Sequence, residues 1–359
     1  MKKTTLGHII SIVALVLTCS ACAPKPTTTP PVATLAPTTT PAPTATLAPT
    51  TTPAPTATLA LTATPTVKPD LTVIARDYPK VDGSTSTYPL HMVIACKAFG
   101  VRCTWQETMP LSSERTIGPD MMQRVRAEAD RVFNLVRHTG TNSAYINLIQ
   151  GKADLILVAR APSEDELKAA KENRVELDVR AFALDAFVFL VNVQNPVDDL
   201  KIENVRDIYT GKITDWATFG GKGQIKAYQR DRNSGSKELM EALVMKGAPM
   251  LKSPNMIIET MMGAVNAIGK EPVGIGYSVY YYATFMLPDK NVKLIGVNGI
   301  KPTSENIAKH TYPLATEVYA VTRRNMPKGS TAIMLRDWLL TDEGKAAIAE
   351  SGYVPLAPP

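Results

Sequence analysis

DGSTST at residues 82–87, TGTNS at residues 139–143 and RDRNSGS at residues 230–236 are three short loops that each run directly into a helical pattern. The first N–H groups of a helix have no partner within the helix, and the helix dipole favours negative charge there. One such loop is also typical of an ordinary helix N-cap. Three of them, with an arginine in the third, predict an anion pocket that needs neither a metal nor a catalytic group.

The N-terminal segment has the pattern of an exported lipoprotein. A positive start at Met1–Lys3 precedes an apolar run, Ile9–Leu17, which is too short to span a membrane. Ala21 before Cys22 resembles the lipobox of bacterial lipoproteins, although Cys19 stands where Leu is usual. We therefore predict a signal peptide over residues 1–21 and a lipid on Cys22, which would anchor the protein outside the cytoplasm on the outer face of the cell membrane. An ordinary signal peptide with a free cysteine is the alternative.

Residues 22–69 are predicted to form a tether. Residues 24–67 consist almost entirely of Thr, Pro, Ala and Leu, and TTTPAPTATL at residues 38–47 recurs at residues 50–59. This composition lacks the apolar mass to offset the entropy of ordering, and proline stiffens it toward polyproline II at ~3 Å per residue. The repeat therefore indicates a semi-rigid spacer that joins the lipid anchor to a folded part.

The folded part, from about residue 71 onward, shows no footprint for nucleic acid or a metal. The net charge of the chain is +6, and no run of Lys and Arg occurs, so nucleic acid is not an expected partner. No Cys/His cluster has the spacing of metal ligands, and no cofactor is predicted. Cys96 and Cys103 are the cysteines of this part; in an exported protein they could pair, and free thiols remain equally open.

Alternation of strand and helix patterns predicts an α/β fold. DLILV at residues 154–158 is a continuous apolar run that suits a parallel strand buried on both faces. Further strands are expected at residues 78–81, 187–193, 273–277 and 318–322. Helices are expected at residues 90–99, 120–136, 143–150, 203–209, 237–246, 257–268, 331–340 and 343–351. Ser163 and Glu166 have the S-x-x-E spacing of a capping box that opens another helix.

Several motifs together resemble one known family. They are, in chain order, DGSTSTYP, TGTNSAYINLIQGKADLI, NPVDDLKIENVRDIYTGKITDW, YQRDRNSGS, GIGYS and YPLATEVYAV. The order resembles the phosphate-type substrate-binding proteins of bacterial ABC importers, over about residues 78–353. The resemblance implies the two-lobed type II periplasmic-binding-protein fold, in which two hinge strands join the lobes and the ligand binds between them. Lobe one would be residues 71–185 plus 318–359 and lobe two residues 186–317, with crossings near residues 183–191 and 317–321.

The resemblance also implies ligand-binding residues, which are Ser86, Thr87, Tyr88, Thr141, Ser143, Arg230, Ser234, Gly235 and Ser236. The second loop is expected to supply one hydroxyl, from either Thr141 or Ser143. Arg230 is expected to make a charge-assisted contact to an oxyanion.

One position departs from the family pattern. The phosphate binders carry an Asp two residues before the proline that follows the DLILV-like strand, where it accepts the proton of phosphate. Arg160 stands at that position in this chain, so we include Arg160 as a candidate ligand-binding residue. Glu164 or Asp165 could replace the acceptor, although the capping box explains both. An inward Arg160 offers only donors and predicts a preference for fully ionised oxyanions.

These observations predict a lipid-anchored binding protein for an inorganic oxyanion, with phosphate first, that closes its lobes on the ligand and delivers it to an ABC permease as a monomer. The protein is not expected to be an enzyme. A tethered surface sensor or adhesin on the same fold is one alternative. A Ser/His hydrolase that uses His138 is another, although no G-x-S-x-G elbow is present.

Overall fold

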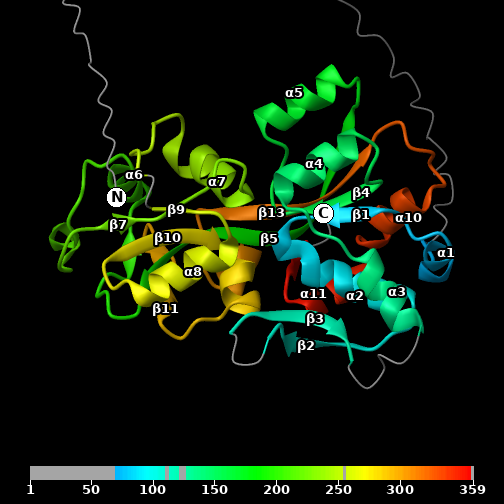
Figure 1. The fold of residues 1–359 in the computed structure, drawn as a ribbon, viewed down its shortest axis with the longest axis horizontal. Coiled ribbons are helices and arrows are strands. Elements are labelled where there is room, and N and C mark those ends of the chain that lie inside the picture. Colours follow the sequence, from blue (N-terminus) through cyan, green and yellow to red (C-terminus); the bar gives the residue numbers. More distant parts are fainter. Residues whose placement is uncertain (1–68, 110–112, 121–126, 254–255, 357–359) are drawn as a thin grey trace, which may run out of the picture. The chain divides into compact units, whose positions relative to one another are not determined.

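The structure is a computed structural model that describes residues 69–109, 113–120, 127–253 and 256–356. The chain divides into two compact units, residues 1–63 and residues 64–359, and the elements below belong to the second (Figure 1). The predicted signal peptide, Cys22 and nearly all of the predicted tether lie outside the described residues. Within the described ranges, no helix is long and apolar enough to cross a membrane.

A mixed sheet organises this unit, and its two halves share one long strand. The first half contains β1 (Val81–Gly83), β4 (Leu155–Val158), β13 (Ala315–Arg323), β5 (Leu177–Asn192) and β14 (Val354–Pro355). The second half contains β5 again with β10 (Gly274–Val279), β7 (Lys226–Ala227) and β11 (Val292–Leu294). Figure 1 shows β5 and β13 side by side across the middle of the unit. Small two-stranded sheets pair β6 (Asp199–Leu200) with β12 (Gly296–Val297) and β8 (Gln229–Arg230) with β9 (Ile257–Ile258).

The shared strand β5 changes partner in its middle. Ala186 pairs with Ala315 of β13, and the next residue, Phe187, pairs with Val279 of β10. The backbone N–H of Phe187 also donates to the carbonyl oxygen of Leu314, 2.9 Å away, just before β13 begins. One strand therefore runs through both sheet halves, and the chain returns to the first half at about residue 315. The exact lobe boundaries stay a prediction.

The apolar run of β4 is buried on both faces, as the sequence predicted. Ile156 and Val158 pack with helix α4 (Thr141–Ile149) on one face, and Leu155 and Leu157 belong to the main core on the other. The strand is parallel to β1 but antiparallel to β13. The parallel neighbour is therefore confirmed, and the sheet as a whole is mixed.

Most of the other helices begin near the predicted residues, while α1 and α9 were not predicted. The other helices are α1 (Leu71–Arg76), α2 (Tyr88–Ala98), α3 (Ala127–Leu135), α5 (Glu164–Glu172), α6 (Ile202–Tyr209), α7 (Gly235–Leu239), α8 (Met261–Lys270), α9 (Ser304–Ala308), α10 (Thr331–Trp338) and α11 (Asp342–Ser351). Shorter turns are η1 (Thr85–Thr87), η3 (Trp216–Phe219) and the π-helical η4 (Met240–Met245) and η6 (Tyr282–Met286). The strand expected at residues 78–81 is β1, which begins later. The helix expected from Ile257 is wrong at its start, because Thr260 caps α8 by accepting from the N–H of Gly263.

A hairpin, β2 (Cys103–Glu107) and β3 (Arg115–Pro119), was not predicted. Apolar and polar residues do alternate in β2, where Cys103 and Trp105 pack against the core, so this strand carried a signal that was overlooked. Cys96 of α2 and Cys103 of β2 form a disulfide with Cα atoms 6.2 Å apart, which settles the alternative that the sequence left open.

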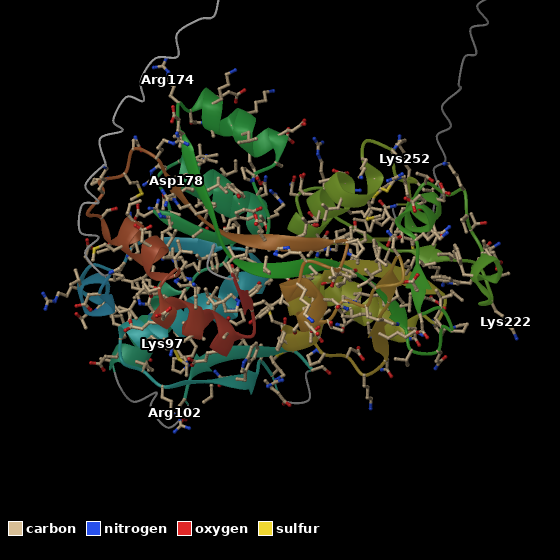
Figure 2. All side chains as sticks on the ribbon, turned by 180° about the vertical axis from the view of Figure 1, so that it is seen from behind. Lys97, Arg102, Arg174, Asp178, Lys222 and Lys252 are labelled. Atoms are coloured by element: carbon tan, nitrogen blue, oxygen red, sulfur yellow. A yellow bond between two sulfur atoms is a disulfide. The ribbon has the colours of Figure 1, made fainter. Side chains whose placement is uncertain are left out.

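The beginning of β5 was also missed, although Leu177 and Val179 alternate there with Asp178 and Arg180 and pack against the core beside α4. Asp178 there accepts hydrogen bonds from Arg180 and from the buried guanidinium of Arg336 on α10. Figure 2 labels Asp178 on the long strand. Hydrogen bonds to a side chain of another element thus hold the polar face of this strand end.

Candidate functional site

The three loops predicted from the sequence line one cavity, whose volume is about 490 Å³. Its lining includes Ser84, Thr85 and Ser86 of the first loop, Thr139, Gly140, Thr141 and Ser143 of the second, and Arg230, Asp231, Asn233, Ser234, Gly235 and Ser236 of the third. Each loop leads into a helix start, at η1 and α2, at α4 and at α7. The convergence places helix N-termini and many small hydroxyl groups around one space, which is the arrangement that favours an anion.

The first loop follows β1 and is held against the end of β4. A Cβ on Gly83 would lie 2.4 Å from the carbonyl oxygen of Leu157, so only glycine permits this close approach. The N–H of Ser84 donates to that same oxygen over 3.0 Å. The hydroxyl of Ser84 accepts from the N–H of Ala159 at 3.1 Å and lies 2.7 Å from that of Thr141. Ser84 was not predicted, and it ties the first loop to the second.

Two residues of the first loop that were predicted to contact the ligand, Thr87 and Tyr88, do not line the cavity. The hydroxyl of Thr87 lies 2.8 Å from the carbonyl oxygen of Ser84 and 2.7 Å from that of Leu157. The N–H of Tyr88 donates to the carbonyl oxygen of Thr85. Both groups therefore stabilise the turn itself, while Ser86, the third candidate of this loop, does line the cavity.

Asp82 positions the second loop behind the cavity. Its buried carboxylate accepts from the N–H of Gly83 at 2.8 Å, from both the N–H and the hydroxyl of Thr139 at 2.9 and 2.7 Å, and from the Asn147 amide at 2.8 Å. Gly140 then turns the chain into α4 with a φ of 91°, which favours glycine. The sequence left Thr141 or Ser143 as the hydroxyl donor of this loop, and both line the cavity.

Arg230 in the third loop is buried, with 6% of its surface exposed. Its Nε donates to the carbonyl oxygen of Ile258 and its Nη2 to that of Glu259, each over 3.0 Å. Nη1 has no hydrogen-bond partner among the described residues. Burial lowers the pKa of this guanidinium, although the nearby Asp231 acts to raise it, and an arginine still stays charged at every physiological pH. Arg230 therefore has a charged donor left for a ligand.

The rest of the third loop forms the N-terminus of α7. The hydroxyl of Ser234 caps the helix by accepting from the N–H of Lys237 at 3.1 Å. A Cβ on Gly235 would lie 2.5 Å from Oγ1 of Thr141, so the third loop approaches the second too closely for a larger residue. Ser236 is buried and lines the cavity.

A fourth helix start, which was not predicted as part of the site, completes the same wall. Thr260, Met261 and Met262 at the beginning of α8 line the cavity. The carbonyl groups that hold Arg230 lie just before them. The signal available in the sequence was Thr260 as an N-cap, but the apolar residues before it suggested an earlier helix start.

Arg160 also lines the cavity, and it is bound to a carboxylate. Its Nη1 and Nη2 each donate to a carboxylate oxygen of Glu166 over 2.8 Å, and Nη1 also donates to the carbonyl oxygen of Ala161 at 2.9 Å. Burial acts to lower the pKa of Arg160, but the hydrogen bonds and charge of Glu166 outweigh it and raise the pKa. The expectation that Arg160 simply offers donors to the ligand therefore does not hold for these two nitrogens.

The two carboxylates weighed as replacement acceptors do not reach this place. Glu164 and Asp165 lie in the exposed first turn of α5 and do not line the cavity. The predicted capping box is confirmed, because Ser163 accepts from the N–H of Glu166 while Glu166 accepts from the N–H of Ser163. The carboxylate that matters for the cavity is thus Glu166.

A further contact joins the β2–β3 hairpin to the second sheet half across the cavity. The hydroxyl of Tyr282 donates to a carboxylate oxygen of Glu114 over 3.1 Å, and both residues line the cavity. The hydroxyl of Thr108 lies 3.1 Å from the other oxygen of Glu114. Burial, and then the charge of Glu114, raise the pKa of Tyr282, so the phenol remains a donor. Neither residue carried a sequence signal, because the hairpin itself was missed.

The lining does not assemble the groups of a hydrolase within the described residues. No histidine is part of it, and the ring of His138 packs edge-on against Tyr88 with centroids 4.6 Å apart. Among the same residues, no group of three or more His, Cys, Asp and Glu side chains is arranged to hold a metal ion. What the cavity offers chemically is hydrogen-bond donors and the charged Arg230, whose Nη2 also lies 3.7 Å from Oδ2 of the partly exposed Asp231.

The fold and the site together define a class, the two-lobed α/β proteins that hold a ligand within a cavity. The family model of the PBP superfamily domain matches residues 116–343, which is more than half of the chain. The chain belongs to the PBP superfamily.

Among curated relatives, the chain is similar to the phosphate-binding protein PstS of Staphylococcus saprophyticus, with 27% identity over 61% of this chain and 70% of that one. The phosphate-binding protein PstS of Bacillus subtilis is 28% identical over 46% of this chain and 53% of its own. Among solved structures, an ABC-type phosphate transport receptor of Vibrio cholerae has a TM-score of 0.54 and 22% identity, and the match covers 77% of this chain and 99% of that one. At this identity the likeness shows the fold.

Proposed function

We propose that the protein captures an inorganic oxyanion, with phosphate as the first candidate, and delivers it to an ABC importer. The observation that carries the proposal is the free Nη1 of the buried Arg230 among helix N-termini that face one cavity. A charged donor and neutral donors in a preformed space suit a small tetrahedral anion. The curated relatives named as phosphate-binding proteins support phosphate.

Calorimetry tests the ligand directly. The purified full chain is titrated with phosphate, sulfate, molybdate and a phosphonate under one buffer condition. Saturable binding of phosphate, with weaker binding of the others, is the expected result. Absence of binding for all four anions would refute the proposed function.

Lobe closure is the proposed mechanism. The strand β5 and the chain before β13 are the connections between the sheet halves, and we infer that they act as the hinge. In the structure Gly235 lies against Thr141 and Tyr282 reaches Glu114, which are the contacts that an opening motion would break. Small-angle scattering with and without phosphate should show a smaller radius of gyration with ligand, and an unchanged radius would contradict the motion.

We also propose that the protein is held as a monomer on the outer face of the cell membrane by a lipid on Cys22, with residues 22–69 as the tether. The support is the sequence pattern around Ala21 and Cys22. Mass spectrometry of the membrane-extracted protein should find a diacylglyceryl group on an N-terminal Cys22. A soluble product that begins elsewhere would exclude the anchor.

A further inference from the structure

The cavity wall also contains a buried ion pair between Arg160 and Glu166. Binding of an anion by Arg230 does not require this pair and does not explain it. Arg160 is 5% exposed and Glu166 is 0% exposed, and the two are joined by a pair of 2.8 Å hydrogen bonds. The remaining donor of the guanidinium, Nε, is buried and has no hydrogen-bond partner among the described residues. Arg160 is thus part of the cavity wall, and the carboxylate of Glu166 balances its charge.

Glu166 is saturated by donors from three segments. Besides Arg160, it accepts from the N–H of Ser163 at 2.9 Å and from the amide of Asn142 at 3.1 Å. Asn142 belongs to the second loop, between the cavity-lining Thr141 and Ser143. Replacing the carboxylate would therefore change a charge directly behind two parts of the cavity wall.

The charges of the residues that line the cavity show how this ion pair affects a bound anion. The charged side chains among the described lining residues are two arginines, Arg160 and Arg230, and three acids, Glu114, Asp231 and Glu259. Glu166 cancels Arg160, and Glu238 of α7 is a further carboxylate that acts on Arg160. A bound anion is thus held by Arg230 and neutral donors, in a setting where each added negative charge on the ligand is poorly compensated.

We propose that Glu166 is a specificity-determining residue, which neutralises Arg160 and thereby makes the cavity favour the less highly charged form of an oxyanion. The proposal rests on the proposed function, since it concerns the same cavity. Removing the carboxylate would deprive Arg160 of its hydrogen-bonded counter-charge and leave only Glu238 to offset its positive charge near the ligand. Because Coulomb energy scales with the ligand's charge, dianions would then gain more than monoanions.

The experiment compares the parent with E166Q, R160M and the double variant R160M/E166Q. Phosphate is titrated at about pH 5.5, where it is mainly a monoanion, and at about pH 8.5, where it is mainly a dianion. Sulfate, a dianion at both, controls for changes in the protein. We expect E166Q to raise the ratio of dianion to monoanion affinity by roughly tenfold, R160M to lower it, and the double variant to return it close to the parent value.

The control S163A removes the helix cap without changing any charge, so it must leave the ratio unchanged. Thermal unfolding confirms that each variant is folded, and if one single variant fails to fold, the other carries the test, because the two shift the ratio in opposite directions. A folded E166Q or R160M with the parent ratio would overturn the inference. A parent that binds no oxyanion at all would instead refute the proposed function.

Discussion

Arg160 and Arg230 both line one cavity, and both are almost completely buried. Arg230 donates hydrogen bonds to two backbone carbonyl groups, its Nη2 lies 3.7 Å from Oδ2 of the partly exposed Asp231, and Nη1 has no hydrogen-bond partner among the described residues. Arg160 donates hydrogen bonds from Nη1 and Nη2 to the carboxylate of Glu166. The comparison teaches that the charge an arginine brings to a site depends on its partner, because a carbonyl orients the guanidinium while a carboxylate also cancels it.

The largest expected effect is a difference in the free energy of unfolding between variants of the two arginines. R160M leaves the buried carboxylate of Glu166 without its cation, which typically costs about 3–5 kcal/mol. R230M removes hydrogen bonds to two carbonyl groups and should cost only about 1–3 kcal/mol. Urea unfolding measures both. Equal losses for the two variants would break the comparison.

Asp185 extends the comparison to a buried carboxylate that has no cationic partner among the described residues. Asp185, next to the point where β5 changes partner, accepts from the N–H groups of Ala186 and Tyr281, while Oδ2 has no partner among the described residues. Burial raises the pKa of Asp185 to about 7. The folded state then holds a proton that the unfolded state releases, so this contribution is fully present below about pH 4 and is lost as pH rises through 7.

We therefore expect D185N to gain stability over the parent as pH rises from about 4 to 8, by at most about 4 kcal/mol. The difference between the two proteins is the quantity to measure, by urea unfolding at several pH values. Burial lowers the pKa of His91 to about 4, which makes stability rise with pH in an overlapping window and offsets the trend in both proteins equally. A difference that does not change with pH would contradict an ionising Asp185.

Ligand affinity should depend more strongly on Arg230 than on Ser234 of the same loop. R230A removes a charge-assisted hydrogen bond to the anion and should weaken phosphate binding at least tenfold, or about 1.5–3 kcal/mol. S234A removes one neutral group that also caps α7 and should cost less. Calorimetry measures both variants, with circular dichroism as the check of folding. An R230A protein that binds like the parent would place the ligand elsewhere.

The smallest effect concerns the contact across the cavity. Y282F removes the phenol that donates to Glu114 and should weaken ligand binding by about 0.5–1.5 kcal/mol, because one closing contact is lost while the anion's donors stay. Y280F, which removes a hydroxyl that is hydrogen-bonded to the exposed Ser304, is the matched control. If both variants bind like the parent, the Glu114 contact does not contribute to closure.

Much of the site could be predicted because its signal is local. A small-residue loop followed by a helical pattern is contained in a few consecutive residues, and all three predicted loops line the cavity. The missed parts lack such a signal. Glu114 and Tyr282 come from distant segments of the chain and meet only in the fold. The hydroxyl of Thr87 donates to the carbonyl oxygen of Leu157, a partner that is distant in the sequence.

The sequence by itself determined the α/β class, the helix starts that line the cavity and the arginine of the third loop. Only the tertiary structure decided which of these groups remain available to a ligand. Glu166 was already explained as a capping residue, and nothing local indicated that it also binds Arg160 and Asn142. The physical reason is that a polar group, once buried, takes whatever partner the fold brings within hydrogen-bond distance.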